Sequence, residues 1–389
     1  MPGALSSLKI LDFTTLLPGP FGTMLMADMG ADIIRVESPI RPDLVRFMPP
    51  IVDGVSAAHR FINRSKRSLA INLKTEAGLK VIQELVQSYD IVIEQFRPGV
   101  MERLGLGYED LKSFNPALIY CSISGYGQTG PYRDRAGHDI NYLSIAGVTY
   151  SNGRKSTGPT PMSLQVADVA GGSYHGVMGI LAAVIHRQQT GEGQYIDISL
   201  TDAAFSMQIS TAPNALVAGI EPELEEMIFN GGTFYDCYET RDCRYLSIAG
   251  IEPHFFENIC QTLGHPEWSC HALSPDPDVQ QMLKTEFTAI IRTKTLAEWE
   301  QVFKGVDSCT EPVLSFSEAC DHPQIKARDL LVKVGDKGSE QVQLACPLKF
   351  SETPPSYRFA GVESGEHNVE ILSELGYTTE EINNFNKQS

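Results

Sequence analysis

Two side chains that could exchange protons with a substrate, His138 and Asp168, lie thirty residues apart in the sequence. A histidine and a carboxylate are the groups most often used for proton transfer near neutral pH. Each stands in a segment that contains glycine, Gly-His-Asp-Ile-Asn-Tyr at 137–142 and Gln-Val-Ala-Asp-Val-Ala-Gly-Gly at 165–172. Glycine lets a ligand approach the backbone closely. A His–Asp pair can equally be structural, so the surrounding sequence has to decide between these interpretations.

A cluster of basic residues could bind a polyanion. Its six members are Arg64, Lys66, Arg67, Lys74, Arg97 and Arg103. In a chain with a net charge of −17 this cluster would suit a polyanionic nucleotide, because the planar guanidinium group of arginine matches the geometry of a phosphate. A solvated basic face is the alternative interpretation. Glu252, in Gly-Ile-Glu-Pro-His, would on its own be a solvated turn residue.

Composition and charge argue against several other classes of function. The net charge of −17 argues against nucleic-acid binding, because no basic excess is left to meet a phosphate backbone. The eight cysteines include no Cys-x-x-Cys pair, so we expect no metal site and no redox dithiol. The apolar run from Val177 to Ile185 is too short to span a bilayer, and prolines interrupt the N-terminal apolar stretch. We therefore expect a cytoplasmic protein without a signal peptide or a membrane contact.

The elements that must position these residues begin with a strand–helix–strand pattern. We expect a strand at Leu8–Asp12, a helix at Gly19–Met29 and a strand at Asp32–Glu37. The pattern continues with a helix at Thr75–Ser88 and strands at Ile91–Glu94 and Leu118–Ser124. It predicts a doubly wound parallel sheet, in which ligands bind at the carboxyl ends of the strands. His138 follows the glycine-rich loop that comes after the last of these strands.

The second half of the chain is expected to add one long helix and a separate domain. A helix over Asp168–Arg187 begins with small residues, and the sequence leaves open whether they serve helix packing or ligand approach. We also expect a strand at Tyr195–Leu200 and a helix at Asp202–Val217. Further strands are expected at 234–238 and 245–249, and further helices at 254–263, 278–292, 296–304 and 369–375. We predict a large doubly wound, Rossmann-like α/β domain (1–229 and 330–389) and a smaller α+β domain (230–329).

Further motifs are spread along the whole chain. They are LDFTTLLPGPFGTMLMADMGADIIRVE, NRSKRSLAINLK, EQFRPGVMERLGLG, SGYGQTGPY, AGHDINY, ADVAGG, GGTFYDCYET with GIEPHFF, PVLSFSEACDHPQIKAR and GEHNVEILSELGY. Together they resemble the family III CoA-transferase superfamily. The Gly-His-Asp-Ile-Asn-Tyr and Ile-Glu-Pro segments resemble its α-methylacyl-CoA racemase branch in particular.

The resemblance implies an interlocked homodimer whose active site lies between the large domain of one subunit and the small domain of the other. His138 and Asp168 would be its proton-transfer residues, and Glu252 would reach the histidine from the other subunit. The resemblance implies that CoA is bound by Ile71, Asn72, Leu73, Lys74, Gln95, Phe96, Arg97, Arg103, Gly137, Asp139, Ile140, Asn141 and Tyr142. Arg64 and Lys66 join them from the basic cluster. The chain departs from some racemases at Ser38, where an arginine would lie near the adenosine; Arg35 or Arg41 could replace it.

The implied reaction inverts the α-carbon of a 2-methyl-branched acyl-CoA through an enolate. One base removes a proton, and a second group returns one to the opposite face. An aspartate with its usual pKa of about 3.9 is a poor donor at neutral pH, so we expect burial to raise the pKa of Asp168 and the pair to titrate as a unit. The developing oxyanion needs backbone N–H donors, beside Gly137 or at the start of the 168–187 helix. No metal is required, and no cofactor beyond the CoA of the substrate.

Two other functions remain open at this point. In a family III CoA-transferase, an aspartate at position 168 would attack an acyl-CoA and form a mixed anhydride. A non-catalytic scaffold that binds CoA esters is the third interpretation. The sequence does not specify the acyl group. Met24, Met26, Met207 and Met227 could contact it or belong to the core.

Overall fold

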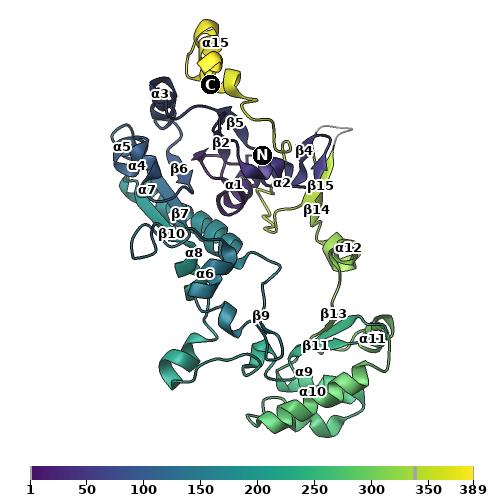
Figure 1. Ribbon diagram of the computed structural model, residues 1–389. Coiled ribbons are helices and arrows are strands. Elements are labelled where there is room, and N and C mark those ends of the chain that lie inside the picture. Colours follow the sequence, from purple (N-terminus) through teal and green to yellow (C-terminus); the bar gives the residue numbers. More distant parts are fainter. Residues whose placement is uncertain (1, 336–339, 389) are drawn as a thin grey trace. The chain divides into compact units, whose positions relative to one another are not determined.

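The computed structural model describes residues 2–335 and 340–388. The chain forms two compact units (Figure 1). The first comprises Met1–Ala146, Ser163–Met207 and Lys326–Ser389, and the second comprises Gly147–Met162 and Gln208–Ile325. The second unit therefore includes residues 147–162 and 208–229, which the sequence had placed in the larger domain.

The first unit is built on a six-stranded parallel sheet in the order β10-β7-β6-β1-β2-β5 (Figure 1). Its strands are β1 (Lys9–Asp12), β2 (Asp32–Glu37), β5 (Arg67–Ala70), β6 (Ile91–Glu94), β7 (Ile119–Ser124) and β10 (Tyr195–Ser199). The chain runs from β1 outwards to β5, returns to β6 on the other side of β1, and then runs outwards to β10. The order reverses between β1 and β6, and ligands of doubly wound sheets bind at this switch point. The expected parallel α/β fold is confirmed.

Helices connect the strands of the first unit. They are α1 (Pro18–Asp28), α2 (Ala57–Ile62), α3 (Glu76–Leu85), α4 (Val100–Arg103), α5 (Tyr108–Lys112), α6 (Asp139–Ile145), α7 (His175–Thr190), α8 (Leu200–Ser206), α14 (Asn368–Glu374) and α15 (Thr379–Gln388). Helix α3 illustrates how capping and an apolar stripe in the sequence determine a helix. The hydroxyl of Thr75 caps it by accepting a hydrogen bond from the backbone N–H of Gly78 (3.1 Å), and Val81, Ile82 and Leu85 form its buried stripe.

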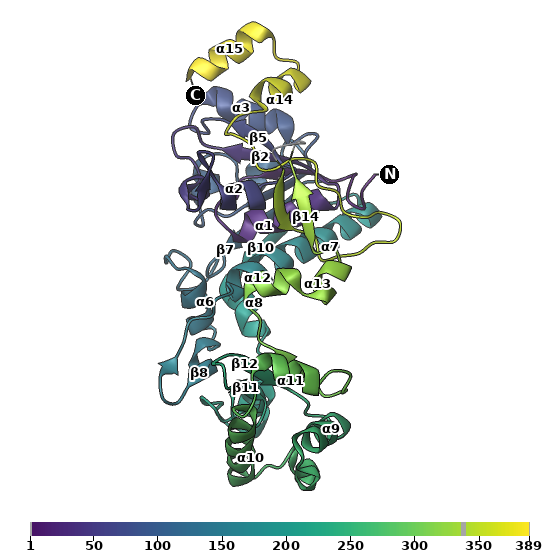
Figure 2. The same ribbon diagram turned by 90° about the vertical axis from the view of Figure 1, so that its right-hand side faces the viewer.

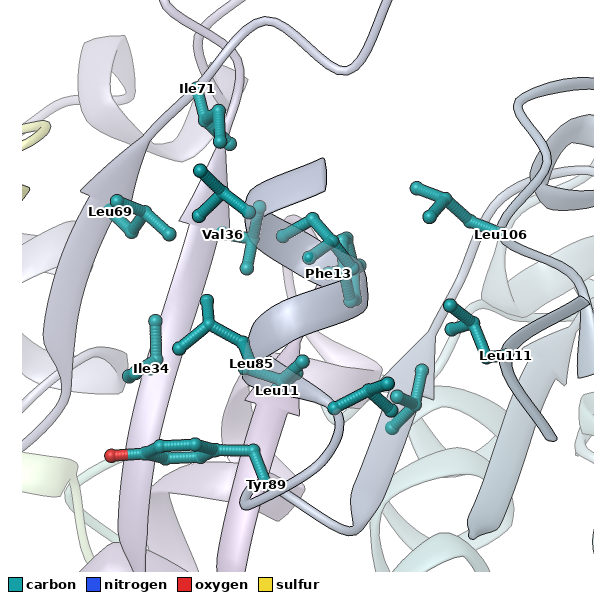
Figure 3. Packing of buried hydrophobic residues seen from close by; sticks show 14 of the residues in the cluster. Leu11, Phe13, Ile34, Val36, Leu69, Ile71, Leu85, Tyr89, Leu106 and Leu111 are labelled. Atoms are coloured by element: carbon teal, nitrogen blue, oxygen red, sulfur yellow. The ribbon is translucent and has the colours of Figure 1, made fainter. Parts of the chain in front are cut away.

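The core of the first unit packs side chains from both ends of the chain. Leu11, Ile34 and Leu69 project from β1, β2 and β5 towards Leu85 of α3 (Figure 3). The same cluster includes Ile371, Leu372, Ile382 and Phe385 near the C-terminus. Helix α14 packs beside β5 (Figure 2). Met24 and Met26 are buried, the former in a smaller cluster with Leu25, so these two methionines belong to the core rather than to an acyl-binding surface.

A π-helix, η3 (Ala167–Tyr174), opens the long helical segment that the sequence predicts over Asp168–Arg187, and α7 continues it. The combined stretch Ala167–Thr190 is long and apolar enough to cross a membrane by length and composition. In the structure one of its faces packs on α1, β7 and β10, whereas Met178, Ala182 and Ile185 on another face are exposed. π-Helical segments are rare and frequently lie at functional sites.

The second unit has an antiparallel sheet of β11 (Asp236–Glu239), β12 (Tyr245–Ile248) and β13 (Thr310–Pro312). Its helices are α9 (Pro253–Leu263), α10 (Pro277–Ile291), α11 (Leu296–Val302) and α12 (Phe316–Asp321), with α13 (Pro323–Ala327) at the boundary. Helix α10 packs on β11, and α11 packs on β12 and β13 (Figure 2). Phe234, Phe256, Phe287 and Trp299 fill the core between them.

Several expected elements differ from the structure. Residues 202–217 do not form one helix: α8 ends at Ser206, and a π-helical turn, η4 (Pro213–Ala218), begins at Pro213. Proline lacks a backbone N–H and cannot continue a helix from the preceding turn. Helix α15 follows the one expected to be last. The remaining short strands are β3 (Ile51–Val52), β4 (Val55–Ser56), β8 (Gly153–Arg154), β9 (Gly158–Pro159), β14 (Leu331–Val334) and β15 (Gln341–Leu344).

Candidate active site

A cavity of about 440 Å³ opens in the first unit where β6 and β7 end. Gln95, Phe96, Arg97, Gly137, His138 and Tyr142 line it. The side-chain oxygen of Gln95 accepts a hydrogen bond from the backbone N–H of Gly19 at 2.9 Å. Gly19 lies in the first turn of α1, which follows β1, so this contact connects the cavity to the switch point between β1 and β6. The cavity is where a doubly wound sheet is expected to hold its ligand.

His138 is presented by the start of α6. It is the N-cap residue of that helix, in extended conformation, and its backbone N–H donates to Oδ1 of Asn141 at 3.0 Å. Asn141 therefore fixes the backbone from which the imidazole projects, and the histidine side chain is left exposed at the cavity.

Tyr142 holds the loop before α6 in place. Its hydroxyl donates to the carbonyl oxygen of Gly137, and its ring meets that of Tyr126 edge-on, with centroids 5.2 Å apart. A Cβ atom on Gly137 would lie 2.7 Å from the Tyr142 ring, and one on Gly125 would lie closer still. Both positions therefore require glycine. Burial, followed by the negative charge of Asp168, raises the pKa of Tyr142 to about 12.

Asp168 lies in the first turn of η3 and is partly buried. Burial raises the pKa of its carboxyl to about 6. The negative charge of Asp139 is the second contribution to this value of about 6, and the charge of His138 opposes both effects. The backbone N–H of Asp168 donates to Oδ1 of Asp139 at 3.0 Å. His138 and Asp168 are therefore close enough for the charge of the histidine to act on the aspartate.

The other residues expected to bind CoA follow the carboxyl ends of β5 and β6. Gln95, Phe96 and Arg97 lie directly after β6, and Arg97 is exposed. Glu94, at the end of β6, accepts a hydrogen bond from the N–H of Phe96 at 2.7 Å, and burial raises the pKa of Glu94 to about 7. After β5, Ile71 is buried, Asn72 and Leu73 are half-buried, and Lys74 is exposed. Ile140 on α6 and Arg103 on α4 are also exposed.

Arg64 and Lys66 do not belong to this edge, which corrects the expectation drawn from the basic cluster. Arg64 is completely buried and binds both carboxylate oxygens of Asp28, at 2.8 and 2.6 Å. Lys66 is 1% exposed and its Nζ contacts Asp12 (3.3 Å) and the carbonyl oxygen of Pro20 (2.8 Å). Charges in such buried pairs satisfy each other, so neither cation is accessible to a phosphate.

The structure also distinguishes Arg35 from Arg41 as a replacement for an arginine at the position of Ser38. Arg35 is buried and paired with Asp43 at 2.5 Å and with Glu37 at 3.3 Å. Arg41 is exposed, and its backbone N–H donates to Oγ of Ser38 at 3.1 Å. Of the two candidates, only Arg41 has a guanidinium group that a ligand could reach.

Two arginines in the cavity wall, Arg133 and Arg135, were missed by the sequence analysis. A Cβ atom on Gly99 would lie 3.1 Å from Nη1 of Arg103 and 3.5 Å from Nη2 of Arg133, so the two guanidinium groups converge there. The signal that could have identified them is the Arg-Asp-Arg sequence at 133–135, which begins four residues before Gly137.

Glu252 belongs to the second unit. It is the N-cap residue of α9, is exposed, and makes no side-chain capping bond. Desolvation, followed by the negative charge of Glu252, raises the pKa of the nearby Cys309 thiol. A separate cavity of about 690 Å³ in this unit is lined by Ile228, Ile251 and Leu273 among others. In residues 2–335 and 340–388, no cluster of three or more His, Cys, Asp or Glu side chains could hold a metal ion.

The fold and the cavity define an α/β protein with a candidate ligand site at the carboxyl edge of a parallel sheet. Comparison with known proteins is more specific. The model of the family "CoA-transferase family III" matches residues 5–368. The human "Alpha-methylacyl-CoA racemase" is 35% identical over 393 residues, which cover 98% of this chain and 96% of that protein. The chain therefore belongs to CoA-transferase family III.

Relatives with a different activity are about equally similar. The "Succinyl-CoA--L-malate CoA-transferase beta subunit" of Chloroflexus aurantiacus is 32% identical over 394 residues, covering 98% of this chain and 96% of that protein. Among solved structures, a CAIB/BAIF family protein from Brucella suis superposes with a TM-score of 0.81 at 29% identity, covering 96% of this chain and 100% of that one. Membership of the family therefore leaves the specific reaction to be inferred from the site.

Proposed function

We propose that this protein is a racemase or epimerase that inverts the α-carbon of 2-methyl-branched acyl-CoA thioesters. One group of the His138–Asp168 pair removes the α-proton, and the C–H electron pair moves into an enolate. The other group, protonated beforehand, returns a proton to the opposite face and restores the thioester. The observation that carries the proposal is the location of His138 beside a partly buried Asp168 whose pKa is raised to about 6.

The raised pKa makes Asp168 usable in both directions. With a pKa of about 6, about a tenth of the carboxyl groups are protonated at pH 7, roughly a hundredfold more than at the ordinary aspartate value. A general acid or base works best when its pKa lies near the operating pH. Backbone N–H groups beside Gly137, in the wall of the cavity, are the donors that we assign to the enolate oxygen.

The CoA part of the substrate supplies binding energy remote from the reacting carbon. We assign its binding to the residues after β5 and β6, from Ile71 to Lys74 and from Gln95 to Arg97, together with Arg103 and the 137–142 segment. These segments lie at the carboxyl ends of strands of one sheet. A long ligand can therefore run along this edge from β5 to the cavity at β7. We assign no cofactor beyond the CoA of the substrate.

We further propose an interlocked homodimer in the cytoplasm, in which Glu252 of one copy approaches His138 of the other. Apolar side chains at the surface of each unit support a partner. Met178 and Ile185 on α7 are 60% and 57% exposed, and Leu216 and Val217 of the second unit are 79% and 86% exposed. Exposed apolar groups in such number are typical of surfaces that are covered in an assembly.

A CoA-transferase is the second candidate, and the partial exposure of Asp168 at the site favours it. In that reaction, the ionised carboxylate attacks the thioester carbonyl, CoA leaves as a thiolate, and a mixed anhydride forms. The thiolate then attacks the aspartyl carbonyl of the anhydride, which releases the first acid and leaves an Asp168–CoA thioester. A second acid takes the CoA by the reverse sequence and frees the carboxylate. His138 distinguishes the two mechanisms, because the transferase needs no second proton-transfer group opposite the aspartate.

The deciding experiment is incubation of a 2-methylacyl-CoA of one configuration in D2O. The racemase exchanges the α-hydrogen for deuterium and produces the other configuration while CoA stays esterified. The transferase leaves the α-hydrogen in place and moves CoA to an added free acid. Asp168→Asn and His138→Gln should each abolish inversion, and the variant that lacks the base facing the α-hydrogen should abolish exchange as well. Asp202→Asn, on the surface of α8, is the matched control. Exchange that persists in both active-site variants contradicts the proposal.

A further inference from the structure

Asp139 connects the two proton-transfer residues. It follows His138 directly and is the first residue of α6. Its Oδ1 atom accepts a hydrogen bond from the backbone N–H of Asp168 at 3.0 Å, across 29 positions of sequence. Asp139 is therefore joined to His138 by a peptide bond and to the backbone of Asp168, on η3, by a hydrogen bond.

The Asp139–Asp168 hydrogen bond connects α6 with η3. Without it, the position of His138 would depend on α6 alone and the position of Asp168 on η3 alone. His138 is held through its own N–H by Asn141, which fixes it relative to α6 only. Asp168 lies in the first turn of a π-helix, where backbone N–H groups have no partner within the helix. A carboxylate that accepts such an N–H is stabilised by the local dipole as well as by the hydrogen bond.

We propose that Asp139 is a positioning residue, whose carboxylate sets the separation of His138 and Asp168 by holding the first turn of η3 against α6. The inference rests on the proposed proton transfer and deepens it. It differs from the role that the family resemblance implies for this segment, which is contact with CoA. Placement matters because a shift of about 1 Å in a reacting group can cost about a hundredfold in rate.

The same carboxylate adds an electrostatic effect. Burial is the largest cause of the raised pKa of Asp168, and the negative charge of Asp139 is the second. The charge of His138 acts in the opposite direction. The elements packed against η3 are α1, α6, α7, α8 and β10. Besides Asp139, their ionisable side chains are Asp28, Tyr142, His175, His186, Arg187, Tyr195, Asp197 and Asp202. Of these, Tyr142 is coupled to Asp168, and Asp28 is paired with Arg64.

Two substitutions separate position from charge. Asp139→Asn keeps an oxygen that can accept the N–H of Asp168 but removes the charge, whereas Asp139→Ala removes both. We expect kcat of Asp139→Ala to fall by roughly a hundredfold with KM for the acyl-CoA within about threefold of the parent value. Asp139→Asn should lose less than about tenfold in kcat. Its pH–rate limb that belongs to Asp168 should move to lower pH, because the charge that raised that pKa is gone.

Amide hydrogen exchange at Asp168 tests the contact without any turnover. The N–H should be protected in the parent and in Asp139→Asn, and exposed in Asp139→Ala, while Asp202→Asn leaves it protected. A rise in KM with an unchanged kcat in both variants would show that Asp139 is a CoA contact and would overturn the proposal. Equal amide protection in Asp139→Ala and the parent would overturn it as well. If the parent itself fails to exchange substrate α-hydrogen, the proposed reaction is wrong, and the amide measurement still decides the contact.

Discussion

Replacing Asp168 by asparagine should stabilise the first unit while abolishing proton transfer. Asp168 has a pKa of about 6 in the folded protein against an ordinary value of 3.8. One pKa unit corresponds to about 1.4 kcal/mol, so keeping this carboxylate ionised at pH 8 costs the folded state up to about 3 kcal/mol. Asparagine carries no charge at any pH and removes that cost.

Because folding raises the pKa of Asp168, the stability gained by Asp168→Asn depends on pH. Because the pKa is raised on folding, the stabilisation associated with protonated Asp168 is lost as the pH rises from 3.8 through about 6. The advantage of Asp168→Asn should therefore reach about 3 kcal/mol at pH 8 and fall to roughly half of that at pH 5. A carboxylate kept partly buried for catalysis is a common source of such a conflict between stability and activity.

Hydrogen exchange is the assay that resolves the two units. Both tryptophans, Trp268 and Trp299, lie in the second unit, so their fluorescence reports unfolding of that unit and should not change. Exchange of β7 and α7 peptides against urea reports the first unit, and Asp202→Asn is again the control for an aspartate on a neighbouring helix. A variant that is no more stable than the parent at pH 8, or that gains equally at both pH values, refutes the burial argument.

Two further predictions test the assignment of the cations and of the glycines. Arg64→Met should reduce the free energy of unfolding by about 3–5 kcal/mol, because it leaves Asp28 buried without its partner. Arg97→Met should change the free energy of unfolding by less than about 0.5 kcal/mol, and it should weaken CoA binding measured by calorimetry. Equal loss of stability in both variants would contradict the separation of buried from ligand-facing arginines. Gly125→Ala should displace the Tyr142 ring and lower the rate of α-hydrogen exchange more than it raises KM, and an unchanged kcat would show that the loop adapts.

Two strands of the sheet were predicted to the residue, whereas β1 and β7 begin one residue later than expected. Asp32–Glu37 and Ile91–Glu94 match β2 and β6 because charged residues end each buried run and leave no alternative boundary. Strand β5 (Arg67–Ala70) was missed, because its short run begins with a cation and a serine. Its neighbours Arg64 and Lys66 look like surface residues in sequence. Their acidic partners lie 36 and 54 positions away, and only folding brings those charges together.

The site itself was predictable in part. His138 and Asp168 could be singled out because their residue types suit proton transfer and their flanking segments resemble those of a family. The π-helical turn at Asp168 was not, since the side-chain spacing of residues 168–187 fits an ordinary helix. The Asp139–Asp168 hydrogen bond was also hidden, because a carboxylate in the first turn of a helix is already explained by the helix dipole.

The location of the C-terminal helices in the core has a consequence for synthesis on the ribosome. Ile371, Leu372 and Phe385 belong to the same cluster as Leu11 and Ile34, so this hydrophobic core cannot close until residues 371–385 have been translated. Residues 208–325, most of the second unit, emerge in between as a nearly continuous segment and can fold first. The nascent first unit therefore exposes apolar side chains of its sheet until these helices are made, and transiently exposed surface of this kind is prone to aggregation.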